Sequence, residues 1–522
     1  MIQDMKPYVL ISSFLLIFQT TALNQSTFNK RFHFDFPAVL LTSLISTDTA
    51  YYAIGVIADS IAPYKKSNIF VRFDLLGNPT SIRTIRDTGK THETWRSTLI
   101  ETYDGGFAAV GYSFDQKMNA LFIKYDNNGD TLYTKKHGSI FSPENDFIYP
   151  RALVQAPDSG FVLVSAVYNP NSFNNGDISI SRLDKLGNLE WQKAFGNHFW
   201  DDPLEIISTE GGYVIGSTRS NINLVDKDFV SQCHIFKVDH EGNIAWQYFS
   251  PHDELFFGAN KIFISPLSSD LIILSKKGVE EPININAGNL KWNNYIFSLD
   301  SDRNFQWGTF FRDSFPVNLD LNSLNKIVYL PEEPSYIIAG NILDMEQEAA
   351  KHKGLLAKIS LEGDSIWSRY FNYVDNETTF HYLYDLEKTS DNGFIMCGQA
   401  KDAAETPQGQ QAWLLKVDEH GCLVPGCHLT TDLEETDTPF LDISIYPNPT
   451  SDYLNVFIPQ QPIKNTAIRL LNINGQEINF IDSISLDTTF IIPVNTWEKG
   501  AYILQWLDEN GNTISSQQFI VN

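Results

Sequence analysis

Clusters of carboxylates, amides and cysteines are the residues of this chain whose types and spacing could do chemistry. The segment YDNNGDTLY, Tyr125 to Tyr133, places two carboxylates, two asparagines and a glycine within nine residues, as a calcium-binding loop does. A calcium loop of the EF-hand type also needs a glutamate at its twelfth position, and none follows. The residue at the place of Asn128 differs among related segments: Leu76, Leu186, Glu241 and His420. A shared metal site does not tolerate such changes, so the sequence favours a turn that starts with Asp126 and uses Gly129 for a positive φ.

A second set of carboxylates recurs at the heads of predicted strands. These residues are Asp35, Glu93, Asp146, Asp202, Glu254, Asp320 and Glu377. Around the mouth of a channel, seven carboxylates would hold a hard cation or raise one another's pKa. The alternative is that each accepts backbone hydrogen bonds in its own crossover, as Asp and Glu commonly do in turns. The sequence favours this alternative and leaves the acidic ring as a candidate site.

The four cysteines fall into two groups. Cys422 and Cys427 close the short loop GCLVPGC, which predicts a disulfide in an exported protein, with two free thiols as the alternative. Cys233 and Cys397 lie in apolar, strand-like runs and are predicted to be core thiols. The sequence has no CxxC, HExxH or paired-histidine spacing, so it predicts neither a zinc site nor a cofactor.

No catalytic motif stands out in the sequence. It contains no nucleophile elbow, P-loop or dinucleotide fingerprint. The main enzymatic alternative is a sialidase-like glycosidase, whose propeller carries Asp-box turns resembling SxDxGxTW. The segment LDKLGNLEW differs from that box in both intervals, and no carboxylate pair of the kind that glycoside hydrolysis requires stands out from the repeats. We therefore predict a protein without catalytic activity and keep the glycosidase as the alternative.

The elements that must position these residues form a repeat of about 57 residues. One segment recurs as DGGFAAVGYSF at Asp104, DSGFVLVSAVY at Asp158, EGGYVIGSTRS at Glu210 and DNGFIMCGQAK at Asp391, with degenerate copies at Thr49, Ser269 and Pro334. A second segment, such as FIKYDNNGDTLY, follows each copy, and an apolar run precedes each. These patterns predict four strands per unit, which we call A to D in chain order. Seven units predict a seven-bladed β-propeller, because radial repetition leaves no long exposed sheet edge.

Two further features bear on how the propeller is held together. An aromatic residue recurs four positions past the turn glycine: Tyr133, Trp191, Trp246 and Trp367. Identical placement in successive units predicts packing between blades, with ligand stacking as the alternative. The last D strand is interrupted by Pro425, and proline removes a ladder donor, so we predict that Phe28 to Phe32 supplies the outer strand of the seventh blade.

The predicted blades have one face of short turns and one face of long connections. The long connections run from Ala58 to Asn68, Tyr168 to Asp177, Ser217 to Gln232, Lys276 to Asn294, Ile342 to Lys353 and Gln399 to Gln410. Variable loops on a rigid scaffold commonly carry binding sites. We therefore predict that this face binds an unknown glycan or protein ligand.

The composition and the two ends of the chain indicate where in or outside the cell the protein acts. Of 522 residues, 63 are acidic and 38 basic, and the net charge of −25 disfavours nucleic acid and anionic lipid surfaces as partners. Residues 1–22 carry Lys6 followed by the apolar run Val9 to Phe18, which predicts a signal peptide too short to span a bilayer. No later segment resembles a membrane helix. We predict a propeller over 27–429, an acidic linker over 430–440 and a small immunoglobulin-like β-sandwich over 441–522.

The last of these regions resembles a known family. Its motifs are YPNP (Tyr446, Pro447, Asn448, Pro449), LLNINGQEI around Gly475, KGAYILQW with Lys499, Gly500 and Tyr502, and the closing FIVN. In this order they resemble the C-terminal sorting domain, type A, of the type IX secretion system of Gram-negative bacteria. The resemblance implies that the type IX machinery recognises this domain at the outer membrane, after which it is cleaved and the cargo released or attached to the surface. The alternative is an ordinary carbohydrate-binding or adhesive sandwich.

Together these features predict an all-β protein that is secreted or held at the cell surface and acts as a binding or adhesion module. The alternatives are a glycan-active enzyme and a scaffold in the cell envelope. A carboxylate pair about 5 to 9 Å apart in a cleft would favour the enzyme. An aromatic-lined groove without such a pair would favour binding.

Overall fold

The computed structural model describes residues 26–522 with gaps. The gaps are 59–64, 88, 142–145, 169–175, 197–199, 224–227, 252–255, 280–290, 312–322, 345–350, 374–378, 403–408, 430–443, 459–466, 474, 482–487 and 508–512. The predicted signal peptide and the predicted acidic linker therefore lie outside the described residues. The chain divides into two compact units, Met1–Leu429 and Thr430–Asn522, and each is described by itself.

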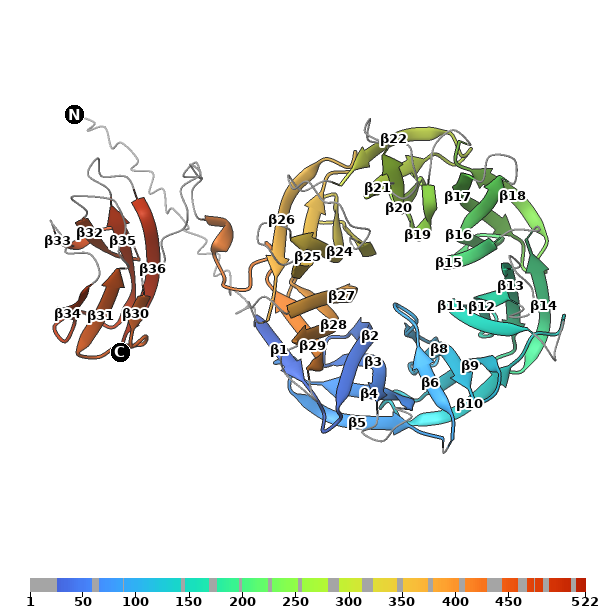
Figure 1. The fold of residues 1–522 in the computed structure, drawn as a ribbon, viewed down its shortest axis with the longest axis horizontal. Helices are drawn as coiled ribbons and strands as arrows, with labels where there is room; N and C mark the ends of the chain where they lie inside the picture. Colours follow the sequence, from blue (N-terminus) through green and yellow to red (C-terminus); the bar gives the residue numbers. More distant parts are fainter. Residues whose placement is uncertain are drawn as a thin grey trace, which may run out of the picture. The chain divides into compact units, whose positions relative to one another are not determined.

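Strands make up nearly all regular structure in the described residues, where the one helical element is the 3-10 helix η1 (Cys427–Leu429). The all-β prediction is confirmed. In the first unit, successive sets of antiparallel strands are arranged in a ring, and we number these sets as blades in chain order (Figure 1). Blade 1 comprises β2 (Ala38–Ser46), β3 (Tyr51–Ala58), β4 (Lys66–Phe73) and β5 (Pro79–Ile85). Blade 2 comprises β6 (Thr91–Thr94), β7 (Ile100–Glu101), β8 (Phe107–Phe114), β9 (Met118–Tyr125) and β10 (Thr131–His137).

The next three blades follow the same up-and-down order. Blade 3 comprises β11 (Phe147–Gln155), β12 (Phe161–Tyr168), β13 (Gly176–Leu183) and β14 (Leu189–Phe195). Blade 4 comprises β15 (Trp200–Thr209), β16 (Gly212–Asn223), β17 (Asp228–Val238) and β18 (Ile244–Phe249). Blade 5 comprises β19 (Phe256–Ile264), β20 (Leu271–Val279), β21 (Lys291–Leu299) and β22 (Phe305–Phe310).

The last two blades bring the two ends of this unit together. Blade 6 comprises β23 (Ser323–Leu330), β24 (Ser335–Asp344), β25 (Lys351–Ile359) and β26 (Ser365–Phe371). Blade 7 comprises β27 (Thr379–Lys388), β28 (Phe394–Asp402), β29 (Gln410–Val417) and β1 (Phe28–Phe32). The outer strand of blade 7 thus comes from the start of the described chain, as the sequence predicted, and β1 lies beside β29 in Figure 1. Side chains reinforce this pairing, because the Trp413 indole donates a hydrogen bond to Asn29 Oδ1 (2.6 Å).

Hydrophobic residues of neighbouring blades form the core of the ring. The B and C strands of each blade are buried on both faces, which explains their continuous apolar runs. Between blades 1 and 2, for example, Ile54 and Phe70 belong to the same buried cluster as Phe107 and Ile123. Burial of apolar side chains between blades is the main favourable contribution to holding the ring together.

Every A strand is interrupted at an equivalent place, and this irregularity matters for the site. Six A strands carry a β-bulge there, at Leu41/Ser43, Pro150/Ala152, Pro203/Glu205, Ala259/Lys261, Leu324/Lys326 and Leu383/Asp385. The A strand of blade 5 carries a second register shift, at Phe256/Ala259. A glycine commonly stands opposite in the B strand, because the A strand approaches closely. At Gly398, for instance, a Cβ would lie 1.7 Å from the carbonyl oxygen of Tyr382. In blade 2 the strand breaks altogether between β6 and β7.

The second unit contains two antiparallel sheets that share one core. One sheet has the order β30 (Ser444–Tyr446), β31 (Tyr453–Ile458) and β34 (Thr488–Pro493). The other has the order β33 (Glu477–Ile481), β32 (Ala467–Asn472), β35 (Gly500–Leu507) and β36 (Thr513–Val521). A single buried cluster takes Leu454 and Ile492 from the first sheet and Leu470, Trp506 and Phe519 from the second.

Candidate functional site

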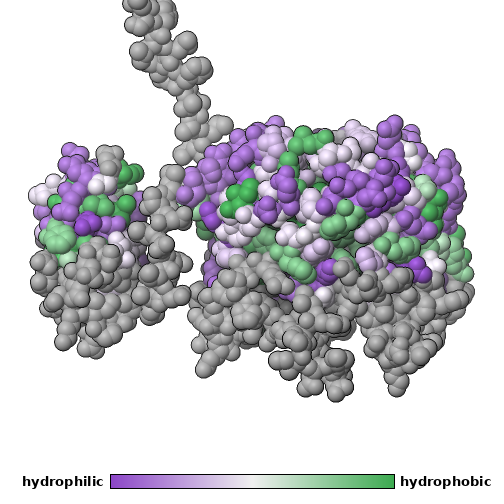
Figure 2. All heavy atoms as spheres, turned by 90° about the horizontal axis from the view of Figure 1, so that it is seen from above, coloured by the Kyte–Doolittle hydropathy of each residue, from purple (hydrophilic) through white to green (hydrophobic). Residues whose placement is uncertain are grey.

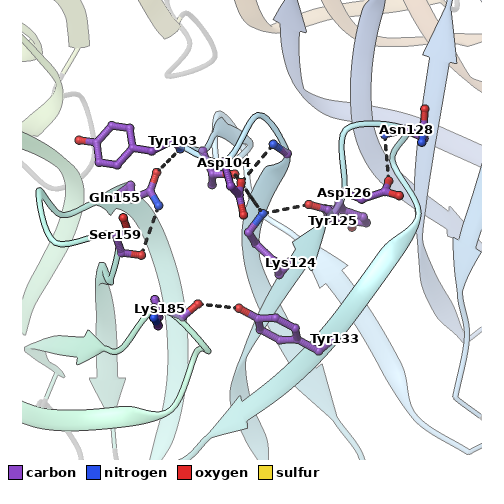
Figure 3. Close-up of polar contacts among 12 residues, drawn as sticks. Tyr103, Asp104, Lys124, Tyr125, Asp126, Asn128, Tyr133, Gln155, Ser159 and Lys185 are labelled. Carbon is purple, nitrogen blue, oxygen red and sulfur yellow. Dashed lines mark hydrogen bonds and ion pairs between the residues drawn. The ribbon is translucent and has the colours of Figure 1, made fainter.

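The segment Tyr125 to Tyr133 forms the turn between the C and D strands of blade 2. Asp126 Oδ1 accepts a hydrogen bond from the backbone N–H of Asn128 (2.9 Å; Figure 3) and another from the backbone N–H of Asp130 (2.8 Å). Equivalent aspartates accept the same kind of bond in other blades: Asp74, Asp184, Asp239, Asp300 and Asp418. The segment that resembles a calcium loop is therefore built as a turn.

The recurring aromatic residues contact the turn of the following blade. A Cβ on Gly242 would lie 2.7 Å from Trp191, and a Cβ on Gly421 would lie 2.7 Å from Trp367. Trp246 lies under Arg303, whose guanidinium carbon is 5.4 Å from a ring centroid, and the Tyr133 hydroxyl donates to the carbonyl of Lys185 (2.9 Å; Figure 3). These contacts join neighbouring blades and support the packing interpretation over ligand stacking.

Charged pairs on the same face tie the A–B turns to the C strands. Lys124 Nζ lies 3.0 Å from Asp104 Oδ1 and also donates to the carbonyl of Tyr125 (3.1 Å; Figure 3). Burial raises the pKa of Asp104, but hydrogen bonds from Thr102 and Lys124 outweigh burial and lower it to about 2. The same tie recurs as Arg182 to Asp158, Lys358 to Glu333 and Lys416 to Asp391. These polar residues on the face of short turns therefore stabilise the fold.

The predicted acidic ring is described at four of its seven positions. Glu93 accepts from Lys66 Nζ (2.6 Å) and from the Tyr112 hydroxyl, Asp146 accepts from the Ser139 hydroxyl (2.8 Å), and the Asp35 side chain is 99% exposed beside His33. Asp202 forms a two-pronged pair with Arg151, from Nε to Oδ1 (3.0 Å) and from Nη2 to Oδ2 (2.7 Å). No three of these four described carboxylates bring oxygens within 4.8 Å of one another. Glu254, Asp320 and Glu377 lie outside the described residues.

Asp418, Cys422 and His428 are the one described group of three whose ligand atoms lie within 4.8 Å of one another. Cys422, however, is bonded to Cys427 in a disulfide, with Cα atoms 5.6 Å apart, and a bridged sulfur has no thiolate to offer a metal. Asp418 already accepts two backbone hydrogen bonds in its turn. Cys233 and Cys397 are fully buried, and burial raises the pKa of both thiols, so both are structural.

The structure describes the ends of the six long connections. In blade 4, β16 and β17 pair as far as Asn223 and Asp228, so most of the predicted connection from Ser217 to Gln232 is strand and not loop. Residues 59–64, 169–175, 224–227, 280–290, 345–350 and 403–408 lie outside the described residues. The described ends surround the inner wall of the ring, on the side where A strands begin and B strands end. There the structure brings together a pocket of about 550 Å³, within the range that small-molecule sites span. Its described lining residues are Arg96, Lys276, Ser323, Asn341, Phe380, Tyr382, Tyr384, Gln399, Lys401 and Gln410.

The bulge in β27 directs Tyr384 toward this central pocket. Asn341 Oδ1 accepts a hydrogen bond from the backbone N–H of Leu383 (2.6 Å), and Asn325 Nδ2 donates to the Leu383 carbonyl (2.6 Å). Two side chains of blade 6 therefore satisfy backbone groups beside the irregularity, which would otherwise be costly to bury. The Tyr384 hydroxyl accepts from Gln399 Nε2 (2.7 Å), and burial raises the pKa of Tyr384 to about 12, so it remains protonated.

A column of flat side chains runs along the wall of the pocket. The His352 ring packs at a tilt against Phe380 and Tyr382, with ring centroids 5.4 Å and 4.9 Å apart, and Tyr382 stacks on Tyr384 with centroids 6.2 Å apart. The Arg96 guanidinium lies over Tyr384, 4.2 Å from the ring centroid, and completes the column. Because each ring supports the next, the column holds Arg96 in a defined orientation.

Arg96 reaches this place from blade 2, through residues 95–99 between β6 and β7. Ser97 has a φ of +52°, and its backbone N–H donates to the carbonyl of Thr42 in blade 1 (2.9 Å). The Ser97 hydroxyl donates to the carbonyl of Tyr384 in blade 7 (3.2 Å). On the other side Trp95 packs under Arg151 of blade 3, 4.4 Å from the guanidinium carbon. Three blades thus fix the segment that carries Arg96.

Two carboxylates near the pocket belong to a seam between blades. Lys326 Nζ lies 3.0 Å from Asp385 and 3.5 Å from Glu387. Asp385 is 1% exposed and also accepts from the Ser43 hydroxyl (2.8 Å) and the Leu44 N–H (3.0 Å). Burial lowers the pKa of Lys326, but the charges of Asp385 and Glu387 outweigh burial and raise it. These groups join blades 6, 7 and 1 and do not line the pocket.

The sequence predicted the face of long connections as the binding face. The pocket residues Lys276, Gln399, Lys401 and Gln410 fall within those connections, but Arg96 was not predicted. Arg96 lies in ETWRSTLIE, where the regular A-strand pattern would continue, and the break in that pattern is a signal that could have identified it. A glycine also stands opposite most of these interruptions, such as Gly111 opposite the break in blade 2 and Gly398 opposite the bulge in blade 7, and it marks where the A strand is distorted. The charges of Lys276 and Lys401 carry no sequence signal, because only the fold brings them together.

The motif residues of the second unit support its fold. Asn448 Nδ2 donates to the carbonyl of Gln518 (3.0 Å), and its Oδ1 accepts from the N–H of Ile520 (2.9 Å), so the YPNP segment is bonded to β36. Gly475 closes the turn between β32 and β33 with a φ of +76°. Tyr502 packs on Trp497 and donates to the carbonyl of Glu498 (2.7 Å).

The fold and these motifs define a β-propeller-like protein with a C-terminal export domain. Residues 444–522 match the family described as secretion system C-terminal sorting domain. The predicted type IX sorting domain is therefore confirmed, and with it export to the outside or the surface of the cell. No curated protein sequence matches the chain. In the part of the chain that the structure describes, no helix is long and apolar enough to cross a membrane.

Several solved propellers are similar in fold at low identity. The plexin A4 extracellular region, domains 1 to 8, is 9% identical with a TM-score of 0.42 and matches over 95% of this chain and 67% of its own. An alpha-L-arabinanase of Penicillium chrysogenum is 9% identical with a TM-score of 0.41 over 62% of this chain and 92% of its own. The propeller domain of the Trilobed protease from Pyrococcus furiosus is 9% identical with a TM-score of 0.40 over 72% and 95%.

Proposed function

We propose that this chain is an exported binding module whose ligand site is the central pocket. In this proposal residues 27–429 form a closed seven-bladed β-propeller, and residues 441–522 form an immunoglobulin-like sandwich that delivers it through the type IX machinery. The seven sets of antiparallel strands among the described residues, closed by β1 on β29, support the blade count.

The observation that carries this proposal is the composition of the pocket wall. Three aromatic rings line it, and none of its described lining residues is an aspartate or a glutamate. Glycoside hydrolysis needs two carboxylates that reach the substrate. Asp385 and Glu387 form a carboxylate pair nearby, but both are bonded to Lys326. Binding therefore fits the pocket better than hydrolysis does.

An array of glycans and protein ligands tests the binding function. The probe is the chain from Thr27 to Asn522, compared with Lys401→Trp, which fills the mouth of the pocket, and with Lys185→Trp on the face of short turns as the matched control. We expect the unmodified chain and the control to bind the same ligand and Lys401→Trp to lose it. Equal binding by both variants, cleavage of the ligand, or no binding anywhere on the array would contradict the proposal.

Deletion of 441–522 tests export separately. Because recognition at the outer membrane requires the sorting domain, we expect the shortened chain to accumulate in the periplasm. The full chain carrying Lys401→Trp serves as the control and should appear outside the cell in the usual amount. Secretion of the shortened chain at the level of the full chain would contradict the export claim.

A further inference from the structure

We propose that the loop 421–429, at the end of blade 7, forms a zinc site when its disulfide is reduced. The ligands are Cys422, Cys427, His428 and Asp418. This inference goes beyond the proposed binding function, because it does not depend on the central pocket. Three observations carry it: the convergence of the donor atoms, the spacing of the ligands in the chain and the contact of the loop with the start of β1.

The donor atoms of this loop already converge. One carboxylate oxygen of Asp418, the Cys422 sulfur and one ring nitrogen of His428 lie within 4.8 Å of one another. Cys422 Sγ is 3.8 Å from His428 Nδ1, close to the roughly 3.5 Å that separates a sulfur and a nitrogen ligand at a tetrahedral zinc. Because Cys427 Sγ is bonded to Cys422 Sγ, it belongs to the same group. Two sulfurs, an imidazole and a carboxylate make up the four ligands that a structural zinc site requires.

The ligands are also close together in the chain. The spacing Cys-x4-Cys-His places two sulfurs and an imidazole within seven residues. Four intervening residues are within the range of two to four that separates paired cysteines in structural zinc sites. The sequence thus lacks the short CxxC form but contains the longer one.

Neighbouring groups hold two of the ligands in position. Asp418 Oδ1 accepts hydrogen bonds from the backbone N–H groups of His420 (2.9 Å) and Cys422 (2.7 Å), and its second oxygen takes no part in either bond. The His420 ring packs on the His428 ring, with centroids 3.5 Å apart. Groups that orient the ligands in this way raise the affinity of a metal site.

The metal binds only after the disulfide is reduced. A dithiol supplies two electrons and two protons: the bond between Cys422 and Cys427 breaks to give two thiols, and the dithiol becomes a cyclic disulfide. Zinc then displaces the two thiol protons and binds the thiolates. Cys422 is fully buried and Cys427 only half-buried, so we expect the dithiol to attack the Cys427 sulfur.

The loop contacts the start of the strand that closes the ring. The Thr27 hydroxyl, next to β1, donates to the Leu423 carbonyl (2.6 Å), and the Leu423 side chain packs against the core between blades 6 and 7. The disulfide fixes this loop in the oxidised chain, and zinc would fix it in the reduced chain. Zinc would therefore preserve the contact between the loop and Thr27 under reducing conditions.

The first test titrates zinc chloride into the chain from Thr27 to Asn522 by calorimetry. One sample is oxidised, and the other is treated with a dithiol that is then removed in the absence of oxygen. We expect the reduced chain to bind one zinc ion and the oxidised chain to bind at least about 100-fold more weakly, because it offers no thiolate at this loop. No binding by the reduced chain, or equal binding by both forms, would overturn the proposal.

The second test identifies the ligands in the reduced chain. Cys427→Ser and His428→Gln each remove one ligand and should weaken zinc binding at least about tenfold. Asp418→Asn keeps an oxygen acceptor for the turn but loses the negative charge and should weaken binding about tenfold. His240→Gln changes an exposed histidine in the corresponding turn of blade 4 and should leave binding unchanged. Full affinity in Cys427→Ser or His428→Gln would contradict the site.

Melting temperatures separate loss of the site from loss of the fold. Without zinc, reduced His428→Gln should melt within about 2 °C of the reduced unmodified chain, because the His428 side chain is exposed. Zinc at about 100 times its dissociation constant should raise the melting temperature of the reduced unmodified chain by about 2–4 °C and leave that of the oxidised chain unchanged. A rise of the same size in reduced Cys427→Ser would overturn the proposal.

Discussion

The face of short turns and the wall of the central pocket are built from the same repeat but use their polar residues differently. On the turn face, the aspartates that begin the turns have local partners, as Asp126 has in Asn128 and Asp130 and as Asp104 has in Lys124. On the pocket wall, Arg96 lies where the repeat pattern is broken. The other blades have no lysine at the position that Lys401 occupies in the repeat. The contrast teaches that residues which recur from blade to blade stabilise the fold, whereas residues that depart from the repeat form the candidate site.

Figure 2 shows part of the outer rim of the ring, coloured by hydropathy. Hydrophobic residues on the rim in view are scattered among hydrophilic ones. Exposed apolar residues such as Ile244, Phe305 and Ile366 recur at the outer strands of successive blades. Hydrophobic residues that are exposed singly are normal on protein surfaces and do not mark a site.

The largest expected difference is between a carboxylate on the turn face and one in the seam between blades 6, 7 and 1, which lies near the pocket. Asp385→Ala removes the partner of buried bonds from Ser43, Leu44 and Lys326, so we expect a loss of about 3–5 kcal/mol in the free energy of unfolding. Asp104→Ala, on the turn face, removes a carboxylate that is 62% exposed, and the buried Lys124 keeps its bonds to Thr102 and the Tyr125 carbonyl, so the cost should be lower, about 1–2 kcal/mol. Urea unfolding followed by tryptophan fluorescence measures both, and equal losses would show that burial does not separate the regions.

A second prediction separates backbone strain from packing on the turn face. Gly242 and Gly105 have the same φ of +77°, but a Cβ on Gly242 would lie 2.7 Å from Trp191, whereas a Cβ on Gly105 has nothing within 4 Å. We expect Gly105→Ala to cost about 1 kcal/mol and Gly242→Ala about 2–4 kcal/mol. The same unfolding experiment compares them. Equal costs would mean that the contact between blades adds nothing to the turn.

The third prediction concerns pH and the aromatic column. Burial lowers the pKa of His352 to about 4, below the value of roughly 6.5 that the unfolded chain would show. Its neutral form therefore stabilises the fold above pH 6.5, and this contribution is lost as the pH falls toward 4. Between pH 7 and pH 5 the unmodified chain should lose about 1–2 kcal/mol more than His352→Phe. His240→Gln changes an exposed residue on the turn face. This variant should lose as much stability between pH 7 and pH 5 as the unmodified chain does. A His352→Phe variant with unchanged pH dependence would contradict this assignment.

The smallest expected effect compares two tyrosine hydroxyls. Tyr384→Phe removes the acceptor of Gln399 in the pocket wall and should cost about 1 kcal/mol, since the amide loses a partner. Tyr133→Phe removes a more exposed hydroxyl that donates to Lys185 and should cost about 0.5 kcal/mol. Thermal unfolding by circular dichroism suits both. A larger loss for Tyr133 would reverse the ranking of the two regions.

Much of the fold could be predicted from the sequence, because the same strand and turn pattern occurs in several copies. The strand order, the D strand supplied by Phe28 to Phe32 and the packing role of Trp191 all depend on patterns that recur. The sorting domain followed from four ordered motifs. These features could be predicted because local rules and the global fold agree on them.

The site could be predicted only as a face. Arg96 contacts Tyr384 although the two residues lie in blades that are not adjacent, and this contact depends on the unpaired segment 95–99. The predicted acidic ring shows that a shared repeat position does not make a shared site. Glu93 and Asp202 occupy the same position in their repeats, but each has its own cationic partner. Residues of blades that are not adjacent come close only because the ring of blades closes. The pattern of a single sequence does not show which residues these are.

The most direct test of the central claim is a crystal structure of the chain from Thr27 to Asn522 with the ligand that it binds best on the array. The account predicts an intact ligand in the central pocket, in contact with Arg96 and Lys401. A ligand bound on the turn face or on the sorting domain would contradict the account, as would a cleaved ligand beside Asp385 and Glu387.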